Sequence, residues 1–567
     1  MTIEQKSYAS GPSEQPLQCH TMGELLDSVV SRFPHGEALV SRHQSLRFTY
    51  RELGNAVEEL ARALMAVGIK KGDRVGIWSQ NNAEWVLVQF ATGKIGAILV
   101  NLNPAYRIPE LEYALKQSDT RALILSPAYR TSNYVEMIRK FLPEVKSGTD
   151  GAVKSDRLPD LKLVVTIGDE EHPGFLSWGR LLAKAEDVSK EDLHARQAEL
   201  EFDDPINIQY TSGTTGLPKG ATLTHHNIVN NGYFIGESLR FTHNDRLCIP
   251  VPFYHCFGMV LANMACVTHG ATMVLPNDRF EVESVLDTLE VEECTAVHGV
   301  PTMFSAMMES LDKSSRSFPS LRTGIMAGSP CPIELMKQVI NRLGAKEITI
   351  AYGMTETSPV SFQTTPDDPI DLRVSTVGKI HPHVEAKVID VLGRTVQIGD
   401  PGELCTRGYL VMLYYWNDPE GTAGAIDPAG WMHTGDLAIM DADGYVNIVG
   451  RIKDMISRGG EKVFPREVEE VLYTHPAISE AQVIGVPDAK YGEQVMAWIK
   501  LKEGASATDA DIREFCKDAM AYFKIPKYIK FVSEFPITVT GKVQKYKMRE
   551  VSIQELGLQD AASIKTA

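Results

Sequence analysis

The chain has 567 residues, which is too many for one hydrophobic core, so we expect at least two domains. Its formal net charge of −16 argues against nonspecific nucleic-acid binding but does not exclude an anionic substrate held in a local basic pocket. The eight cysteines stand singly, with no C-x-x-C pair, which favours a reducing compartment and gives neither a disulfide framework nor a zinc site.

The N-terminal stretch is polar and has none of the features of a targeting peptide. Residues 1–18 carry an early acid, so they match neither a secretory signal nor an arginine-rich transit peptide, and we expect them to be mobile. The run that comes closest to a membrane span, residues 248–267, contains two prolines, a histidine and an asparagine. That composition favours a buried core segment. We therefore expect a cytoplasmic protein without a transmembrane segment.

Residues 19–452 alternate between strand-like and helix-like patterns. Thr49 and Glu52 form a capping-box pattern before a helix whose apolar residues recur at helical spacing. Apolar strand candidates occur at 74–78, 97–102, 122–126, 162–167, 207–211, 295–300, 323–328 and 348–353. Strand and helix alternating at these intervals predict an α/β fold, with a large N-terminal domain of doubly wound sheets and helices on both faces. Ligands of such sheets bind at the carboxyl ends of the strands.

The pattern changes near residue 450, where a second, smaller unit begins. A short strand, a glycine turn and a helix starting at Pro465 are followed by strand candidates at 481–486, 495–501 and 528–532 and a helix near 508–522. We therefore divide the chain into a large domain at 19–452 and a small α+β domain at 453–567, a typical size for a separate unit. We expect roughly the last ten residues to be mobile.

One loop has the composition of a phosphate-binding site. The stretch YTSGTTGLPKG at 210–220 combines hydroxyl groups, glycines and a lysine, yet Pro218 and Gly220 flank Lys219 where a P-loop has glycine and Ser or Thr. The loop joins two strands, so it differs from a strand-to-helix turn. On composition alone, an anion-binding loop and a flexible surface turn are equally good interpretations. The candidate residues are Thr211, Ser212, Gly213, Thr214, Thr215, Gly216, Leu217, Pro218 and Lys219.

Four further stretches, in a fixed order, give this loop a family context. AYGMTET (351–357), WMHTGDLA (431–438), GRIKDMISRGGEKVFPREVE (450–469) and PITVTGKVQK (536–545) follow it. With the loop they resemble the adenylate-forming (AMP-binding) superfamily, in particular its acyl-CoA synthetases and most closely its medium-chain fatty-acyl-CoA ligases. The resemblance implies that a carboxylate and ATP give an acyl-AMP and pyrophosphate. Coenzyme A then gives acyl-CoA and AMP, and a mobile small domain rotates between the two steps.

The resemblance also assigns roles in ATP binding. It implies that the loop at 211–219 holds the β- and γ-phosphates, that Thr355 donates to the α-phosphate, and that Glu356 holds Mg²⁺, although a plain surface acid is the alternative for this glutamate. Asp436 would accept from both ribose hydroxyls, and Arg451 would reach the ribose or the phosphates. The adenine would lie between two groups of residues, Tyr352 with Gly353 on one side and Gly328 with Ser329 on the other.

By the same resemblance, the C-terminal stretches contain the residues that take part in the rotation of the small domain. Lys542 would place its charge on the α-phosphate and the attacking carboxylate during adenylation; an exposed, solvated lysine is the interpretation without the family. Lys453 would be the hinge, with a simple interdomain linker as the alternative. Gly459 and Gly460 would leave room for the pantetheine arm of coenzyme A.

Some residues and the substrate are less determined. His255 resembles a gate beside the acyl pocket, but a core histidine bonded to a carbonyl explains it equally well. We interpret His225 and His226 as structural or solvent-facing. Tyr414 stands where relatives often have glycine. A medium-chain fatty acid is the expected substrate, with an aryl or branched short-chain acid as the alternative; a catalytically inactive nucleotide-binding relative is the alternative of another class. Many relatives form dimers, so a homodimer is a further expectation.

Overall fold

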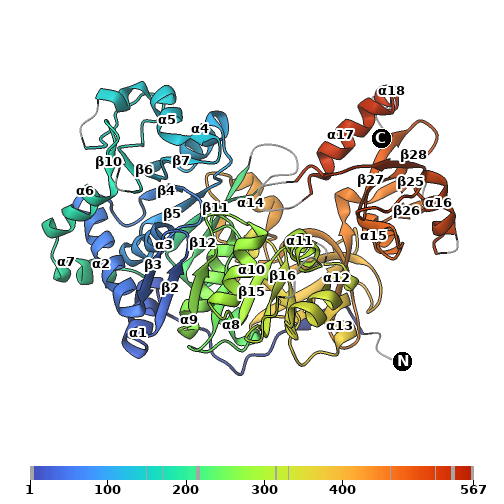
Figure 1. The fold of residues 1–567 in the computed structure, drawn as a ribbon, viewed down its shortest axis with the longest axis horizontal. Helices are drawn as coiled ribbons and strands as arrows, with labels where there is room; N and C mark the ends of the chain where they lie inside the picture. Colours follow the sequence, from blue (N-terminus) through green and yellow to red (C-terminus); the bar gives the residue numbers. More distant parts are fainter. Residues whose placement is uncertain are drawn as a thin grey trace.

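The computed structural model describes residues 5–147, 150–168, 170–211, 218–312, 316–329, 331–459, 461–517, 519–537 and 543–562. A large domain and a small C-terminal domain lie side by side along the long axis of the molecule (Figure 1). The large domain contains two mainly parallel sheets with helices between their strands, so the predicted α/β fold is confirmed. No helix among these residues is long and apolar enough to cross a membrane.

The first sheet has eight strands and carries the candidate phosphate loop at one end. Six parallel strands are followed by two antiparallel ones, β12 and β22. Their mostly apolar sequences match strands that are covered on both faces. In sheet order the strands are β10 (Leu176–Ser177), β9 (Leu163–Thr166), β6 (Thr120–Leu125), β4 (Arg74–Trp78), β5 (Ile98–Leu102), β11 (Pro205–Thr211), β12 (Lys219–Thr224) and β22 (Tyr414–Tyr415).

The second sheet has nine strands, and its six central strands are parallel. The strands at its two ends pair antiparallel. In sheet order they are β19 (Lys379–Ile380), β18 (Val360–Gln363), β17 (Glu347–Gly353), β16 (Thr323–Ala327), β15 (Ala296–Gly299), β13 (Arg246–Cys248), β14 (Thr272–Leu275), β2 (Glu37–Ser41) and β3 (Leu46–Thr49).

Helices join the two sheets into one core. The predicted capping box is present at the start of α2, where Thr49 Oγ1 accepts a hydrogen bond from Glu52 N. Helix α3 is buried on nearly every side, as expected for a helix inside a large core. The α-helices of this domain are α1 (Met22–Arg32), α2 (Tyr50–Ala66), α3 (Ala83–Ile95), α4 (Ile108–Gln117), α5 (Tyr134–Phe141), α6 (Trp178–Ala183), α7 (Lys190–Gln197), α8 (His225–Ser238), α9 (Ala265–His269), α10 (Val282–Val291), α11 (Pro301–Leu311), α12 (Ile333–Gln338), α13 (Ile370–Ser375) and α14 (Pro419–Ala425).

The apolar run at 248–267 lies in this core, as the sequence predicted. It leaves β13 and forms the π-helix η3 (Phe257–Met264), which continues directly into α9. Every residue of η3 is buried. The two prolines lie in the loop between β13 and η3, before the helical part begins, where they interrupt no helix.

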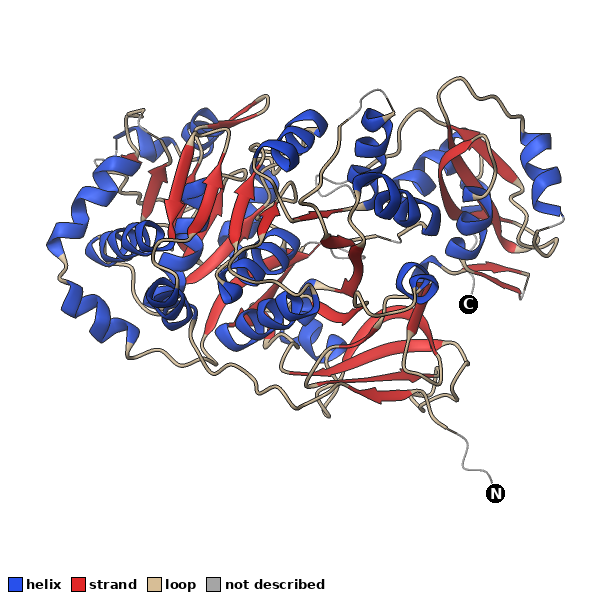
Figure 2. Cartoon of the chain, turned by 60° about the horizontal axis from the view of Figure 1, so that its bottom comes forward, coloured by secondary structure: helices blue, strands red, loops and turns tan. Residues whose placement is uncertain are grey.

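A third sheet, which the sequence did not reveal, closes the large domain. It is antiparallel, with the strands β1 (Tyr8–Ser10), β20 (Val384–Ile389), β21 (Gly402–Gly408), β23 (Met432–Met440) and β24 (Val446–Arg451) in that order. Figure 2 shows this sheet beside the N-terminus and separate from the sheet of the small domain.

The expected mobility of residues 1–18 needs correction for residues 5–18. Strand β1 pairs with β20, and Ser7 Oγ donates to the carbonyl of Gln397 at 2.7 Å. Further along, Gln18 N donates to Asn230 Oδ1 at 2.7 Å. Backbone pairing and these hydrogen bonds fasten the polar segment to the domain, because its hydrogen-bonding groups find partners that its composition does not indicate.

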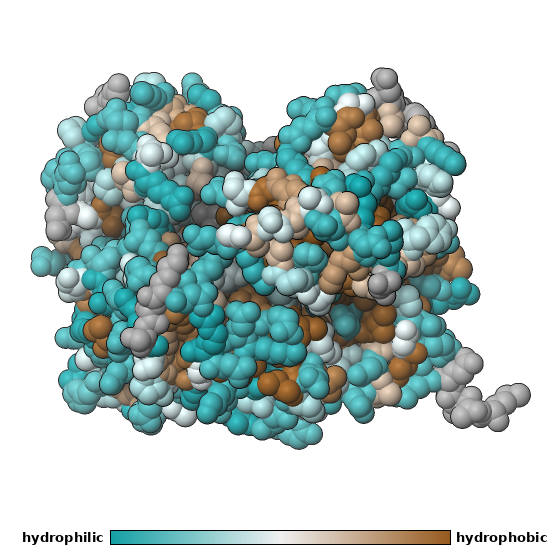
Figure 3. Space-filling view, turned by 45° about the vertical axis from the view of Figure 1, so that its right-hand side comes forward, coloured by the Kyte–Doolittle hydropathy of each residue, from teal (hydrophilic) through white to brown (hydrophobic). Residues whose placement is uncertain are grey.

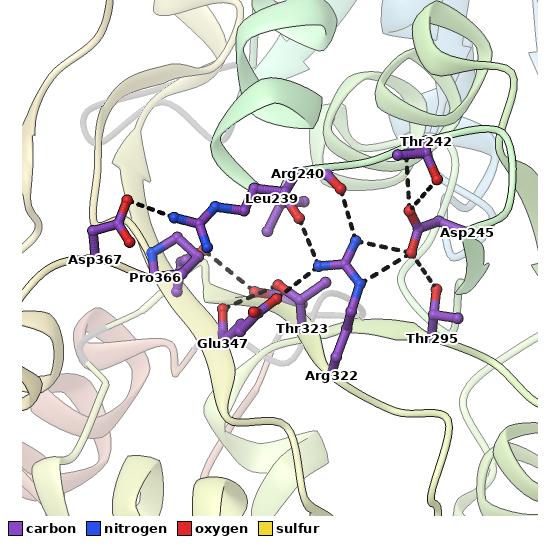
Figure 4. Close-up of polar contacts among 12 residues, drawn as sticks. Leu239, Arg240, Thr242, Asp245, Thr295, Arg322, Thr323, Glu347, Pro366 and Asp367 are labelled. Atoms are coloured by element: carbon purple, nitrogen blue, oxygen red, sulfur yellow. Dashed lines mark hydrogen bonds and ion pairs between the residues drawn. The ribbon is translucent and has the colours of Figure 1, made fainter.

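A network of ion pairs ties together the amino ends of the central strands (Figure 4). Arg322, just before β16, contacts Asp245, just before β13, through Nη2 at 2.8 Å and Glu347, at the start of β17, through Nη1 at 2.7 Å. Asp245 is buried and also accepts from Thr295 Oγ1 at 2.7 Å. These contacts lie at the opposite end of the parallel strands from their carboxyl ends, where ligands of such sheets bind.

The small domain contains a sheet in the order β26, β25, β28, β27, with β29 paired to β28. The predicted strands and the helix that starts at Pro465 are confirmed, but the helix expected near 508–522 ends at Lys517 and a later helix, α17, was not foreseen. Its elements are η6 (Ile452–Asp454), β25 (Ile456–Arg458), β26 (Glu461–Val463), α15 (Pro465–Tyr473), β27 (Ile478–Asp488), β28 (Gly492–Leu501), α16 (Asp509–Lys517), β29 (Tyr528–Phe531), α17 (Lys545–Glu555) and α18 (Gln559–Ala562).

Candidate active site

A large cleft runs between the two domains, and Figure 3 shows the surface hollowed between two lobes. Its volume is about 3370 Å³, well above the roughly 300–1,000 Å³ of a small-molecule pocket, because it continues along the domain boundary. Most of the predicted site residues line it. They are Thr211, Pro218, Lys219, His255, Gly328, Ser329, Tyr352, Gly353, Thr355, Glu356, Asp436, Arg451 and Lys453.

Some predicted residues lie outside the described part of the chain. These are Ser212, Gly213, Thr214, Thr215, Gly216 and Leu217 of the phosphate loop, Gly460 of the glycine turn, and Lys542. Their roles stay predictions. The strands that flank the loop are described: β11 and β12 pair antiparallel, with Thr211 opposite Lys219, so the loop is a strand-to-strand connection as expected.

Asp436 is held from two sides at the end of the cleft expected for ribose. It faces Arg451 across the β23–β24 pair, and Arg451 Nε lies 3.1 Å from Asp436 Oδ1. Tyr352, on β17, donates from its hydroxyl to Asp436 Oδ2 at 2.6 Å. Burial raises the pKa of the Asp436 carboxyl, while Arg451 and the Tyr352 hydrogen bond act in the opposite direction. The sequence suggested only ring stacking for Tyr352, so its bond to Asp436 is a new role.

The turn that presents Asp436 has a support that sequence reasoning missed. Glu403, on β21, accepts from Gly435 N through Oε1 at 3.2 Å and lies 3.2 Å from His433 Nδ1 through Oε2. Gly435 adopts a φ of 69°, which glycine tolerates and most residues do not. Glu403 therefore fixes the left-handed turn directly before Asp436. Only the pairing of β21 with β23 brings these residues together, and no local pattern signals it.

At the part of the cleft expected to hold the phosphates, a buried glutamate and a lysine lie on either side of a tyrosine. Glu356, in the short helix η5 (Thr355–Thr357), is buried, so the interpretation as a plain surface acid is wrong. Its Oε1 accepts from the Tyr415 hydroxyl at 2.7 Å. Lys219 Nζ lies 4.8 Å from the centre of the Tyr415 ring and 3.7 Å from Asp418 Oδ2. Thr355 Oγ1 lies 3.7 Å from Cys256 Sγ.

His255 lines the cleft, but one of its ring nitrogens is used locally. Its Nδ1 accepts from Phe257 N at 3.1 Å, at the start of η3. The structural interpretation of His225 is supported, because its Nδ1 accepts from Met22 N at 3.0 Å and burial lowers its pKa to about 3. A buried histidine that the sequence analysis did not consider, His298, contacts the carbonyl of Leu261 in η3 through Nε2 at 3.0 Å.

The short helix η6 connects the last strand of the third sheet, β24, which ends at Arg451, to the first strand of the small domain's sheet, β25. Lys453 lies within η6, and burial together with the charge of Arg451 lowers its pKa. From the small domain, Arg466 Nη1 donates to the carbonyl of Ile448 at 2.6 Å and so ties α15 to β24. Gly459 has a φ of 60° and donates from N to the carbonyl of Tyr491 at 2.8 Å. A Cβ there would lie 2.8 Å from the Tyr491 ring, so this turn requires glycine.

Tyr414 and Tyr415 form the short edge strand β22, which pairs with β12. Because side chains alternate along a strand, Tyr415 is buried toward Glu356 while Tyr414 is exposed. An exposed phenol at position 414 causes no conflict with the fold, which removes the question raised by the missing glycine.

Comparisons with known proteins give matches along most of the chain. A model of the AMP-binding enzyme family matches residues 26–416, and a model of the AMP-binding enzyme C-terminal domain matches residues 467–542. YngI of Bacillus subtilis (strain 168), provisionally named an acyl-CoA synthetase, is 48% identical over 542 residues, covering 95% of this chain and 98% of that protein. The mitochondrial medium-chain acyl-CoA ligase ACSF2 of Danio rerio is 45% identical over 555 residues, or 97% and 91% of the two chains.

A solved structure has a similar fold over nearly the whole chain. The crystal structure of the anthranilate CoA ligase AuaEII in complex with anthranoyl-AMP superposes with a TM-score of 0.85 at 28% sequence identity. The match covers 96% of this chain and 99% of that one.

Proposed function

This chain belongs to the AMP-binding enzyme family, and on that premise we propose that it is an AMP-forming fatty acid–CoA ligase that prefers medium-chain acids. The support is the agreement between relatives named medium-chain acyl-CoA ligase and a cleft lined by most of the residues that were expected to bind ATP. The observation that carries the proposal is the Tyr352–Asp436–Arg451 group, which presents a buried carboxylate suited to a nucleoside sugar.

In the proposed first step, a carboxylate oxygen of the acid attacks the α-phosphorus of ATP. The bond from that phosphorus to the bridging oxygen of the β-phosphate breaks, and pyrophosphate leaves with the electron pair. Asp436 accepts from the ribose hydroxyls, Thr355 donates to the α-phosphate, and Lys219 neutralises the departing phosphates together with the loop at 211–218. Negative charge spreads over the phosphoryl oxygens, so fixed donors and cations lower the barrier.

The residues at the phosphate end fit a bound Mg²⁺. Mg²⁺ is usually held by one or two carboxylates together with substrate phosphates, and Glu356 supplies one buried carboxylate. One of its oxygens is bonded to Tyr415; the described residues show no hydrogen-bond partner for the other. When bound, the ion would neutralise charge on the phosphate oxygens.

In the proposed second step, the thiol of coenzyme A attacks the acyl carbonyl of the acyl-AMP. A carbon–sulfur bond forms, the thiol proton is lost to solvent, and AMP leaves. We propose that Lys542 serves the first step only and that the small domain, residues 453–567, turns about Lys453 so that the glycine turn at 459–460 admits the pantetheine arm. The large domain, 19–452, would hold ATP and the acid throughout.

A panel of acids tests the function. We expect AMP release that depends on ATP, acid and coenzyme A, with the highest kcat/KM for medium-chain acids in a series from acetate to palmitate with added benzoates. The likeness to the anthranilate ligase structure supports an aryl acid as the second candidate substrate. If ATP bound but no acid in the panel gave AMP, the chain would be a nucleotide-binding relative without this activity.

We also propose that the enzyme works in the cytoplasm as a homodimer. None of the eight cysteines forms a disulfide, as is usual in reducing compartments. Because the animal relatives are named mitochondrial, cell fractionation should compare both compartments. Light scattering after size-exclusion chromatography should give twice the chain mass.

A further inference from the structure

Tyr415 lies between the two charged groups at the phosphate end of the cleft. Its hydroxyl donates to Glu356 Oε1 at 2.7 Å, and Lys219 Nζ lies 4.8 Å from the centre of its ring. The acid belongs to η5 and the lysine to β12, so one side chain contacts two separate elements. Neither the family resemblance nor the motifs assigned this tyrosine a role.

Backbone hydrogen bonds hold Tyr415 in place, so the position of its side chain beside Glu356 is well defined. Strand β22 pairs with β12, with Ala221 opposite Tyr415. Tyr415 N donates to Thr422 Oγ1 at 2.9 Å, which ties the strand to α14. Tyr415 is only 7% exposed. The buried hydroxyl donates to one carboxylate oxygen, and its burial restricts rotation toward any other acceptor.

The contact with Lys219 also has a defined geometry. A cation within about 6 Å of a ring centre is attracted to the face of the ring. Asp418 Oδ2, at 3.7 Å, contacts the same ammonium group and caps the start of α14 by accepting from Gly421 N at 2.8 Å through Oδ1. The lysine is therefore held next to the ring and directed toward the cleft that it lines.

We propose that Tyr415 is a positioning residue that orients Glu356 for the Mg²⁺–ATP complex and holds Lys219 at the departing phosphates. By occupying Oε1 of Glu356, the hydroxyl leaves Oε2 for the metal. By packing against Lys219, the ring holds the positive charge at the cleft that the phosphates would enter. This inference rests on the proposed function, because it takes the phosphate end of the cleft as the place of pyrophosphate release.

Two substitutions separate the hydroxyl from the ring. Tyr415→Phe removes the hydrogen bond to Glu356 and keeps the contact with Lys219, whereas Tyr415→Leu removes both. Tyr414→Phe is the matched control, because it removes a hydroxyl from the neighbouring exposed residue of the same strand. Thermal unfolding followed by circular dichroism should show all three variants folded before binding is compared.

The decisive measurement is ATP affinity by calorimetry with and without Mg²⁺. Because a hydrogen bond to a charged group is among the stronger ones, we expect Tyr415→Phe to reduce the Mg²⁺-dependent gain in affinity about tenfold, with little change in affinity without Mg²⁺. Tyr415→Leu should also weaken pyrophosphate binding. In a Glu356→Gln background the Tyr415→Phe effect should largely disappear, because the two changes act on one interaction.

The possible outcomes are distinct. If Tyr415→Phe matched Tyr414→Phe in every binding measurement, or kept its full effect in the Glu356→Gln background, the positioning role would be wrong. If wild-type protein bound Mg²⁺–ATP as expected but gave no AMP with any acid, the proposed function would fail while the role of Tyr415 in binding would hold. If wild-type protein showed no Mg²⁺-dependent ATP binding, both would fail.

Discussion

Removing one hydroxyl group at the ribose end should weaken ATP binding without stopping the chemistry. Tyr352→Phe keeps the aromatic ring but deletes the 2.6 Å hydrogen bond to Asp436. Hydrogen bonds to charged groups are worth about 1.5–3 kcal/mol, and Arg451 still holds the other oxygen at 3.1 Å, so we take the lower value. We therefore expect KM for ATP to rise about tenfold with kcat nearly unchanged.

The same substitution should change the pH dependence in a defined direction. Burial already raises the pKa of Asp436, and the Tyr352 hydrogen bond opposes that rise. Without the hydroxyl the pKa should rise further. Because only the carboxylate accepts from both ribose hydroxyls, affinity for ATP is lost as the pH falls through this pKa, and in Tyr352→Phe that loss should begin at a higher pH.

Pyrophosphate exchange measured across a series of pH values gives both the KM for ATP and the pH at which ATP affinity begins to fall. Tyr445→Phe is a suitable control, because its hydroxyl also donates to an aspartate, Asp368, at 2.7 Å, but outside the cleft. The control should keep the wild-type KM for ATP and the wild-type acidic side of the pH profile. An unchanged KM together with an unchanged acidic side of the profile in Tyr352→Phe would refute the inferred support of Asp436.

Three further predictions test other parts of the structure. Lys542→Ala should lose acyl-adenylate formation by roughly two to three orders of magnitude, while thioester formation from preformed acyl-AMP survives; nearly normal pyrophosphate exchange would contradict this. Lys453→Pro should block thioester formation and spare adenylation, and equal loss of both half-reactions would exclude a hinge there. Asp245→Ala should lower the free energy of unfolding by about 3 kcal/mol, because Arg322 loses a buried partner. Asp367→Ala, which removes the exposed ion pair with Arg240, should lower it by less than about 1 kcal/mol. Urea unfolding measures both values, and equal losses would contradict the expected difference.

The sequence predicted the parallel sheets well because their strands are buried on both faces. Continuous apolar runs such as 74–78 and 122–126 are strong local signals, and each became a strand, β4 and β6. The antiparallel third sheet, formed by residues 8–10 and by strands within 384–451, was missed, although it carries Asp436. Its first strand, β1, is three residues long and its partner β20 lies far along the chain, so its composition gave no indication of pairing.

The candidate site was predicted as a set of residues but not as a network. The motifs named Tyr352, Asp436 and Glu356 separately. The structure links Tyr352 to Asp436 across 84 positions and Tyr415 to Glu356 across 59. Such bonds depend on which strands become neighbours, and a single sequence contains no local trace of that. Supporting residues such as Glu403 and Tyr415 therefore become visible only after folding.

The pairing of β1 with β20 has a practical consequence for handling the protein. A variant shortened to begin after Ser10 would lose β1 and leave β20 with open backbone groups at the border of the third sheet. An unpaired edge strand of this kind can pair with strands of other molecules and so promotes aggregation. Such a variant should precipitate more readily than the full chain even if its cleft is intact. An affinity tag placed before residue 5 keeps β1 and is therefore safer than N-terminal trimming.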